Sequence, residues 1–177
     1  MKDGVKIPEV VFKTRVRDDS IGSDNPFRWM DVPSQSLFCG LRTIVFSLPG
    51  AFTPTCSTFQ LPGFEANYKK IRDLGVDEIY VASVNDAFVM NKWLESQNVL
   101  NIKAIPDGTG EFTRQLGMLV AKDNVGFGLR SWRYAAVIRN GIIEKWFEEP
   151  GRQDNFAEDP YGETSPDNII GYLESVR

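Results

Sequence analysis

The sequence has 177 residues, of which 42% are hydrophobic and 25% are charged, a balance typical of one compact domain spanning residues 1–177. Its formal net charge is −4, so it lacks the overall positive charge with which proteins bind nucleic acid or anionic membranes. It contains no histidine, which excludes Ser-His-Asp and Cys-His hydrolases and metal sites that depend on imidazole.

The amino-terminal segment does not resemble a targeting signal. Residues Met1–Lys6 lack the apolar run of a signal peptide, and no later run is long enough to cross a bilayer. We therefore expect a cytoplasmic protein with no membrane partner. An organelle protein whose targeting segment had been removed would have the same sequence.

Short apolar runs alternate with helical patterns along the chain, which predicts an α/β fold. Strands are expected at Thr43–Leu48 and Glu78–Val84, because both segments are apolar and partly β-branched. The segment between them predicts a long helix that begins at Thr53-Pro54, with Thr53 as the N-cap. Pro62 is expected to kink this helix rather than to end it.

The second half of the chain predicts further helices and a hairpin. The helices are expected at Asp86–Ser96, at Gly110–Leu116 and from Ser165-Pro166-Asp167 onward. Asn140-Gly141 suits a type I′ turn, so Arg133–Ile138 and Ile142–Phe147 should form a hairpin around it. The acidic segment Glu148–Pro166, rich in Gly and Pro, predicts a long surface loop before the last helix.

The chemistry concentrates at Cys56, where a strand ends, the chain turns and a helix begins. In the first helical turn, backbone N–H groups have no intrahelical acceptor and the helix dipole is positive. Both effects favour a thiolate, which is the nucleophilic form of cysteine. The alternative is an inert buried cysteine, the usual fate of a free thiol, but the position of Cys56 at a helix start favours reactivity.

The segment Pro49–Cys56 (PGAFTPTC) contains the P-x-x-x-T-x-x-C pattern of peroxiredoxins and resembles its fuller type II form. The resemblance covers about residues 5–175 and is especially clear to the peroxidase part of bacterial peroxiredoxin-glutaredoxin hybrids. Four further segments carry it: Leu61–Phe64, Ser83–Asn91, Ile105–Gly108 and Gly126–Tyr134. It implies a thioredoxin-like fold, with a central mixed β-sheet flanked by helices.

The resemblance also implies roles for individual residues. Cys56 is similar to the peroxidatic cysteine, Thr53 to the hydroxyl that bonds the peroxide, and Pro49 to the proline that shields the pocket. Arg133 is similar to the guanidinium that stabilises charge on the leaving oxygen during in-line attack. Thr53 could instead be only a helix cap, and Arg133 only a surface arginine. Arg130 competes for the guanidinium role, but Arg133 immediately precedes an apolar strand, as the family's arginine does.

The reaction implied by the resemblance is the reduction of hydrogen peroxide or a small organic hydroperoxide. Cys56 would cycle between thiolate and sulfenic acid, with no metal, haem or flavin cofactor. The implied partners are glutathione and glutaredoxin, or thioredoxin, as the reductant, and a second copy of the chain in a homodimer. The alternative function is a redox sensor, in which oxidation of Cys56 signals to a bound protein.

Two residues depart from the family's pattern. Cys39 and Cys56 flank a strand, which places them about 20 Å apart, whereas a disulfide needs Cα atoms within about 7 Å. We therefore expect a structural Cys39, with an intersubunit bridge left open. Type II relatives with an internal disulfide carry their resolving cysteine after the peroxidatic one, but no cysteine follows Cys56 here, which implies reduction by an external thiol. Gln60 stands where close relatives usually have histidine, and glutamine can form hydrogen bonds but cannot titrate.

Four aromatic residues near these motifs have two interpretations. Phe52, Phe88, Phe127 and Trp132 could form an apolar collar or a dimer surface, although aromatic residues are more often simply core. The glycines on either side of Phe127 lack the lysine and spacing of a phosphate loop, so we expect them to serve a turn.

Overall fold

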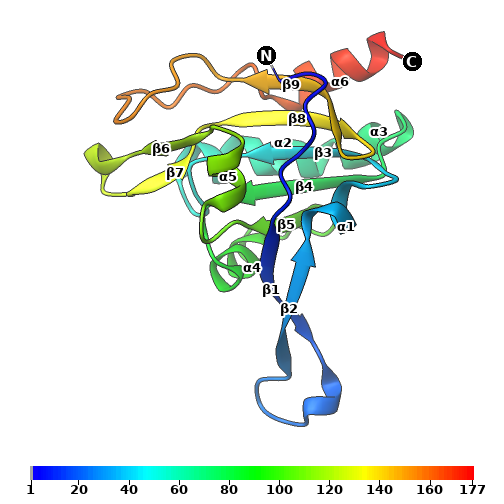
Figure 1. The fold of residues 1–177 in the computed structure, drawn as a ribbon, viewed down its shortest axis with the longest axis vertical. Helices are drawn as coiled ribbons and strands as arrows, with labels where there is room; N and C mark the ends of the chain where they lie inside the picture. The colour runs from blue at the N-terminus through cyan, green and yellow to red at the C-terminus, as the bar shows by residue number, and fades with distance from the viewer. Residues whose placement is uncertain (1) are drawn as a thin grey trace.

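The computed structural model describes residues 2–177 and is built around a five-stranded mixed sheet in the order β5-β4-β3-β8-β9 (Figure 1). The strands of this sheet are β3 (Arg42–Ser47), β4 (Glu78–Ser83), β5 (Lys103–Pro106), β8 (Tyr134–Arg139) and β9 (Ile142–Glu148). β3, β4 and β5 run parallel, whereas β8 pairs antiparallel with both β3 and β9. The predicted α/β fold with a central mixed sheet flanked by helices is confirmed.

Helices and loops cover both faces of the sheet, so its central strands are buried almost throughout, as their apolar sequences require. One face packs against α2 (Leu61–Ala66), α3 (Tyr68–Asp73), α4 (Ala87–Ser96) and α6 (Pro166–Ser175). The other face packs against α1 (Ser34–Phe38), α5 (Glu111–Gln115) and the amino-terminal segment. Two hydrophobic clusters, one on each face, thus hold the sheet in place.

The local signals for helix starts and for the hairpin are confirmed. Asp86 caps α4 by accepting a hydrogen bond from the Val89 N–H at 2.9 Å, and Ser165 accepts one from the Asn168 N–H at the start of α6. Between β8 and β9, Asn140 and Gly141 have φ angles of 49° and 75°, as a type I′ turn requires.

The predicted long helix after Thr53 is present but is not uniform. It starts at Pro54, widens into a π turn over Cys56–Gln60, continues as α2 and is interrupted at Asn67 before α3. In the π turn the Leu61 N–H donates to the Cys56 carbonyl, five residues back. Pro62 has no N–H to donate, so a widened turn just before it keeps the helix continuous.

Two small hairpins were not anticipated from the sequence. One consists of β1 (Val11–Arg17) and β2 (Phe27–Pro33), encloses a short 3₁₀ turn at Asp19–Ile21 and projects from the body of the fold (Figure 1). The other consists of β6 (Leu119–Ala121) and β7 (Leu129–Ser131) and encloses a 3₁₀ turn at Asp123–Val125. Among residues 2–177, no helix is both long and apolar enough to span a bilayer.

Candidate active site

Cys56 lies just beyond the carboxyl end of β3, in the first turn of the helical segment, and its side chain is fully buried. The first backbone bond of this segment runs from the Ser57 N–H to the Thr53 carbonyl at 3.0 Å. The Cys56 N–H therefore belongs to the group of N–H bonds that have no intrahelical acceptor. Thr53 starts the helix as predicted, but the atom that accepts this bond is its backbone carbonyl oxygen and not its side-chain hydroxyl.

The hydroxyl of Thr53 is oriented by a separate contact. Its proton is donated to the Gly50 carbonyl at 2.8 Å, within the turn that connects β3 to the helix. A hydroxyl whose proton is already used still has lone pairs to offer. The Thr53 hydroxyl can therefore still accept a hydrogen bond.

Arg133 lies directly against the sulfur. Its Nη1 atom is 3.5 Å from Cys56 Sγ, and the residue, which immediately precedes β8, is only 1% exposed. The interpretation of Arg133 as a surface arginine is therefore wrong. Burial by itself lowers the pKa of the Arg133 guanidinium, but the negative charges of Cys56 and Asp159 outweigh burial and raise that pKa.

Three further groups fix the orientation of the Arg133 guanidinium. Nη1 also donates to Gln60 Oε1, Nη2 donates to Asp159 Oδ1 at 2.6 Å, and Nε donates to the Pro160 carbonyl at 3.2 Å. An arginine fork bonded at every nitrogen has little freedom to rotate. Gln60, which is fully buried, thus supplies an uncharged acceptor for this cation.

The loop that contains Asp159 is part of the site rather than only a surface excursion. It lies within the predicted surface segment Glu148–Pro166, but Glu149 is buried and holds the loop inward. Glu149 Oε1 accepts hydrogen bonds from the Gly162 N–H and from both the N–H and the hydroxyl of Thr164, at 2.8–2.9 Å. These bonds keep the segment with Asp159 against the Arg133 side chain.

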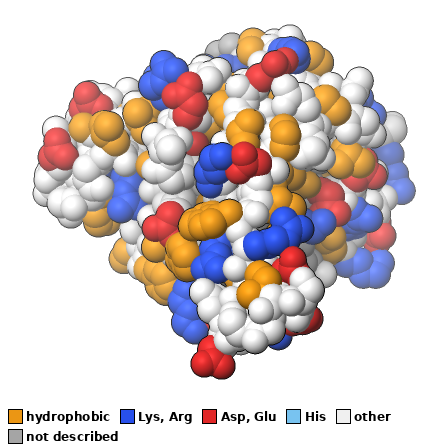
Figure 2. Space-filling model, turned by 60° about the horizontal axis from the view of Figure 1, so that its bottom comes forward, with side chains coloured by type: hydrophobic (Ala, Val, Ile, Leu, Met, Phe, Trp, Pro, Cys, Tyr) orange, Lys and Arg blue, Asp and Glu red, His pale blue; other side chains and the backbone are white. Residues whose placement is uncertain are grey.

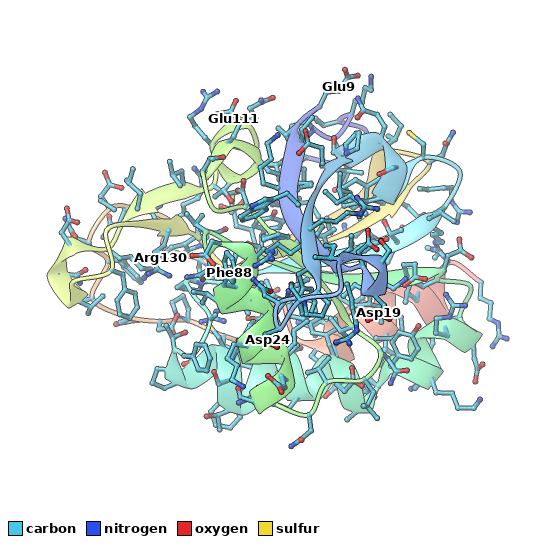
Figure 3. All side chains as sticks on the ribbon, turned by 90° about the horizontal axis from the view of Figure 1, so that it is seen from below. Glu9, Asp19, Asp24, Phe88, Glu111 and Arg130 are labelled. Carbon is cyan, nitrogen blue, oxygen red and sulfur yellow. The ribbon has the colours of Figure 1, made fainter. Side chains whose placement is uncertain are left out.

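The turn that contains Pro49 is held from its other side by Arg130 and Asn85. Arg130 Nη1 donates to the Pro49 carbonyl at 3.3 Å and to Asn85 Oδ1 at 3.4 Å. Asn85 Oδ1 also accepts from the Ala51 N–H at 3.0 Å. A Cβ atom on Gly50 would lie 2.6 Å from Arg130 Nη1, so glycine at this position allows the close approach. Arg130, labelled in Figure 3, thus contacts the turn, whereas Arg133 contacts the sulfur.

A cavity of about 290 Å³ opens beside these residues. It is lined by Pro49, Thr53, Pro54, Thr55, Lys122, Val125, Phe127, Phe156, Ala157, Glu158 and Asp159. The β3–helix turn, the β6–β7 hairpin and the 149–165 loop all contribute to its wall. A small ligand in this cavity would lie next to Thr53 and next to the carboxylate that binds Arg133.

The second cysteine lies apart from this site. Cys39 is exposed and follows α1, before the start of β3, whereas Cys56 is buried beyond the other end of that strand. Both thiols are free. Within residues 2–177, no group of three or more Cys, Asp or Glu side chains is placed to hold a metal ion.

The expectation that the aromatic residues are core is only partly right. Trp132 is buried, but Phe52 and Phe88 are 55% and 54% exposed, and Phe52 has a positive φ of 65°, which is uncommon for a bulky residue. Phe88, labelled in Figure 3, packs edge-on against Trp29, with Arg15 4.9 Å above its ring. Figure 2 shows hydrophobic and basic side chains gathered on this face, near the β1–β2 hairpin.

Phe127 is half-buried between glycines with positive φ, as a turn requires.

Asn85, Asp159 and Lys122 were not identified from the sequence. Asn85 has a usable signal, because it follows the carboxyl end of β4, and the carboxyl ends of parallel strands are where α/β proteins bind ligands. Asp159 and Lys122 have no local signal of this kind. They reach the site through a long loop and a short hairpin whose positions depend on tertiary contacts.

Comparison with known proteins gives the family. Residues 30–163 match the Redoxin family model. A peroxiredoxin of Rhizobium etli is 62% identical over 170 residues, which cover 96% of this chain and 95% of the relative. The hybrid peroxiredoxin hyPrx5 of Haemophilus influenzae is 47% identical over 171 residues, 97% of this chain and 66% of the hybrid. The crystal structure of the Plasmodium falciparum antioxidant protein, a 1-Cys peroxiredoxin, superposes with a TM-score of 0.90 and 36% identity, over 98% of this chain and 99% of that structure. With its thioredoxin-like fold and its buried cysteine beside an arginine, the chain belongs to the peroxiredoxin family of thiol-dependent peroxidases.

Proposed function

We propose that this peroxiredoxin reduces hydrogen peroxide and small organic hydroperoxides by a one-cysteine mechanism, with Cys56 as the attacking thiolate. The observation that carries the proposal is the 3.5 Å contact between Cys56 Sγ and Arg133 Nη1 in a buried setting. A buried, immobilised guanidinium stabilises negative charge on the sulfur before the reaction and on oxygen during it.

The chemical step is a displacement at oxygen. A lone pair of the Cys56 thiolate attacks the terminal hydroxyl oxygen of the hydroperoxide, an S–O bond forms, and the O–O bond breaks. The attacked oxygen keeps its hydrogen, which gives a sulfenic acid, and the other oxygen leaves as hydroxide or alkoxide and takes a proton from water. The Arg133 N–H groups stabilise the leaving charge, and Thr53 Oγ1 accepts a hydrogen bond from the peroxide hydroxyl.

Access to the sulfur is restricted. Cys56 is fully buried, so the peroxide must enter from the cavity past Pro49 and Thr53. In this proposal Pro49 shields the sulfur from bulk water, which strengthens the electrostatic interactions at the reacting atoms. The same shielding slows reactions of Cys56 with larger electrophiles.

The sulfenic acid is reduced by an external thiol. Cys39 is separated from Cys56 by the length of β3, and the sequence has no further cysteine. We propose glutathione with glutaredoxin as the reductant, because a relative at 47% identity is named a hybrid peroxiredoxin, with thioredoxin as the alternative. We further propose a homodimer that covers the exposed Phe52 and Phe88. The expected cytoplasmic location stays a prediction.

Peroxide consumption by the purified protein tests this proposal. The assay is run with glutathione plus glutaredoxin and, separately, with thioredoxin and its reductase, for the wild type and for Cys56→Ser and Cys39→Ser variants. Sustained turnover with the glutathione system that is lost only in Cys56→Ser is the expected result. If a folded Cys39→Ser also stops turnover, Cys39 is a resolving cysteine. A single equivalent of oxidation without turnover in either system would instead indicate a redox sensor.

A further inference from the structure

Lys122 is a buried lysine that the peroxidase mechanism does not use. The residue follows β6 and is only 6% exposed, and its Nζ lies 5.4 Å from the centre of the Trp132 ring. Across residues 2–177, no hydrogen-bond acceptor or carboxylate lies within bonding distance of this Nζ. The face of an indole ring attracts a cation but accepts none of its three N–H bonds in the usual way.

The position of Lys122 is fixed by its backbone. Its N–H donates to the Gly128 carbonyl at 2.9 Å, and its carbonyl accepts from the N–H groups of Phe127 at 3.0 Å and Val125 at 3.3 Å. The β6–β7 hairpin is in turn bonded to the 149–165 loop, because the Ala121 N–H donates to Asp154 Oδ1 at 2.7 Å. The lysine is therefore held by the framework of the site and is not a mobile surface chain.

The Lys122 side chain is more than nine-tenths buried, but Nζ itself is not fully enclosed and opens on the cavity that the residue lines. The ammonium has therefore lost part of its hydration, and no protein acceptor among the described residues replaces it. Buried polar groups in proteins find partners in protein, ordered water or a ligand. For Lys122 Nζ those partners must come from the cavity. The Trp132 ring offsets part of this cost. The N–H groups that remain are available to an anion.

The cavity lined by the turn and helix start that precede Cys56 offers the place for such an anion. Lys122 lines this cavity together with Thr53, and Val125, Phe127 and Phe156 provide apolar walls. Two carboxylates also line it, but Asp159 is bonded to Arg133, and Glu158 is exposed and makes no ion pair with Lys122. Lys122 is thus a cation on the cavity wall, and no carboxylate among the described residues is bonded to it.

We propose that Lys122 binds the carboxylate of a small substrate whose apolar part occupies this cavity. The proposal rests on the proposed function of Cys56, and the carboxylate belongs to either the organic hydroperoxide or the reducing thiol. At about 290 Å³ the cavity is slightly smaller than the roughly 300–1,000 Å³ of typical ligand sites, which suits a chain of a few carbons. Lys122 would then determine specificity at a distance from the reacting sulfur.

Single-turnover kinetics test the hydroperoxide as the source of the carboxylate. Oxidation of Cys56 is followed by the intrinsic tryptophan fluorescence of the protein. Trp93 makes this signal sensitive to the site, because its Nε1–H donates to Ser57 Oγ at 2.9 Å, one residue beyond Cys56. The substrates are 6-hydroperoxyhexanoate, its methyl ester and hydrogen peroxide. We expect the wild type to react about tenfold faster with the carboxylate than with the ester, because a partly buried ion pair contributes on that scale. Lys122→Met should remove this preference, and Lys122→Arg should retain it.

The second arm tests the thiol. Protein oxidised with one equivalent of hydrogen peroxide is reduced with glutathione or with glutathione ethyl ester, and the two rates are compared in the same variants. A charge preference that depends on Lys122 only in this arm assigns the carboxylate to the reductant. Lys69→Met is the matched control, because Lys69 is 88% exposed and pairs with Asp73 on the surface.

The outcomes separate this inference from the proposed function. Hydrogen peroxide should oxidise the wild type and the control Lys69→Met at rates within about twofold of each other. If hydrogen peroxide does not oxidise the wild type, the peroxidase proposal fails. If it does, but neither arm shows a charge preference in the wild type, or Lys122→Met keeps the preference, the role of Lys122 is refuted. Hexanoate, but not hexanol, should also slow the wild-type reaction with hydrogen peroxide, which tests the site even if Lys122→Met does not fold.

Discussion

Replacing Arg133 by methionine should slow the reaction of Cys56 with hydrogen peroxide by about 10² to 10³, the loss typical of removing one preorganised donor to a developing oxyanion. Two unit charges 3.5 Å apart, the distance from Nη1 to Sγ, interact by about 5 kcal/mol at an effective dielectric constant of 20. This is an upper limit, because water admitted by the smaller side chain replaces part of the lost charge. Methionine keeps the bulk and apolar contacts of the arginine stem.

The conservative variant separates charge from geometry. Arg133→Lys keeps the positive charge but cannot bond Cys56, Gln60, Asp159 and the Pro160 carbonyl together, because an ammonium lacks the planar fork. We expect this variant to be about tenfold slower than the wild type and faster than Arg133→Met.

Stopped-flow tryptophan fluorescence, to which Trp93 next to the site contributes, gives the second-order rate constant with excess hydrogen peroxide and without a reductant. Arg139→Met is the control, since Arg139 ends β8, the strand that Arg133 precedes, and its side chain is 61% exposed. Circular dichroism establishes that each variant is folded. A folded Arg133→Met that reacts within about threefold of the wild type would refute the role of the guanidinium.

Three further variants test the surroundings of the site. Gln60→Leu leaves a buried charged N–H without its acceptor, so urea unfolding should show a loss of about 1–3 kcal/mol, and an unchanged midpoint would contradict the bond. Gly50→Ala places a Cβ 2.6 Å from Arg130 Nη1, which should displace that guanidinium and slow peroxide reduction about three- to tenfold with little loss of folded protein. Burial by itself raises the pKa of Glu144, but Arg42 and the neighbouring hydrogen-bond donors lower it below its ordinary value. The ionised carboxylate therefore stabilises the fold above the ordinary glutamate pKa, and this stabilisation is lost as the pH falls through the lowered value. Glu144→Gln should cost about 2 kcal/mol at pH 7 and nearly nothing in strong acid, and an equal cost at both pH values would argue against the pair.

Features that depend on neighbouring residues could be predicted from the sequence. The Asn140-Gly141 turn and the cap at Asp86 follow from side-chain chemistry within four residues, and each is present. The two additional hairpins escaped prediction for a different reason. β6 and β7 are three residues long, too short to show a period of two, and only one residue of β1 is buried.

The residues of the site also fall into two groups, those that a local sequence pattern identifies and those that only tertiary contacts bring to the site. Pro49, Thr53 and Cys56 lie within eight consecutive residues, and a family pattern identified them. Arg133 is 77 residues from Cys56 in the chain, so residue patterns alone favoured a surface arginine, and only the family resemblance pointed to the site. Asp159 reaches Arg133 because Glu149 holds the intervening loop inward, an arrangement that no local pattern encodes.

The most direct test of the central claim is to identify which sulfur the peroxide oxidises. One equivalent of hydrogen peroxide is added to the reduced protein in the presence of dimedone, which traps sulfenic acids, and the labelled peptides are identified by mass spectrometry. We expect one adduct per chain, on Cys56, with no label on Cys39 and no fast peroxide consumption by Cys56→Ser. Label on Cys39, or wild-type consumption by Cys56→Ser, would contradict this expectation.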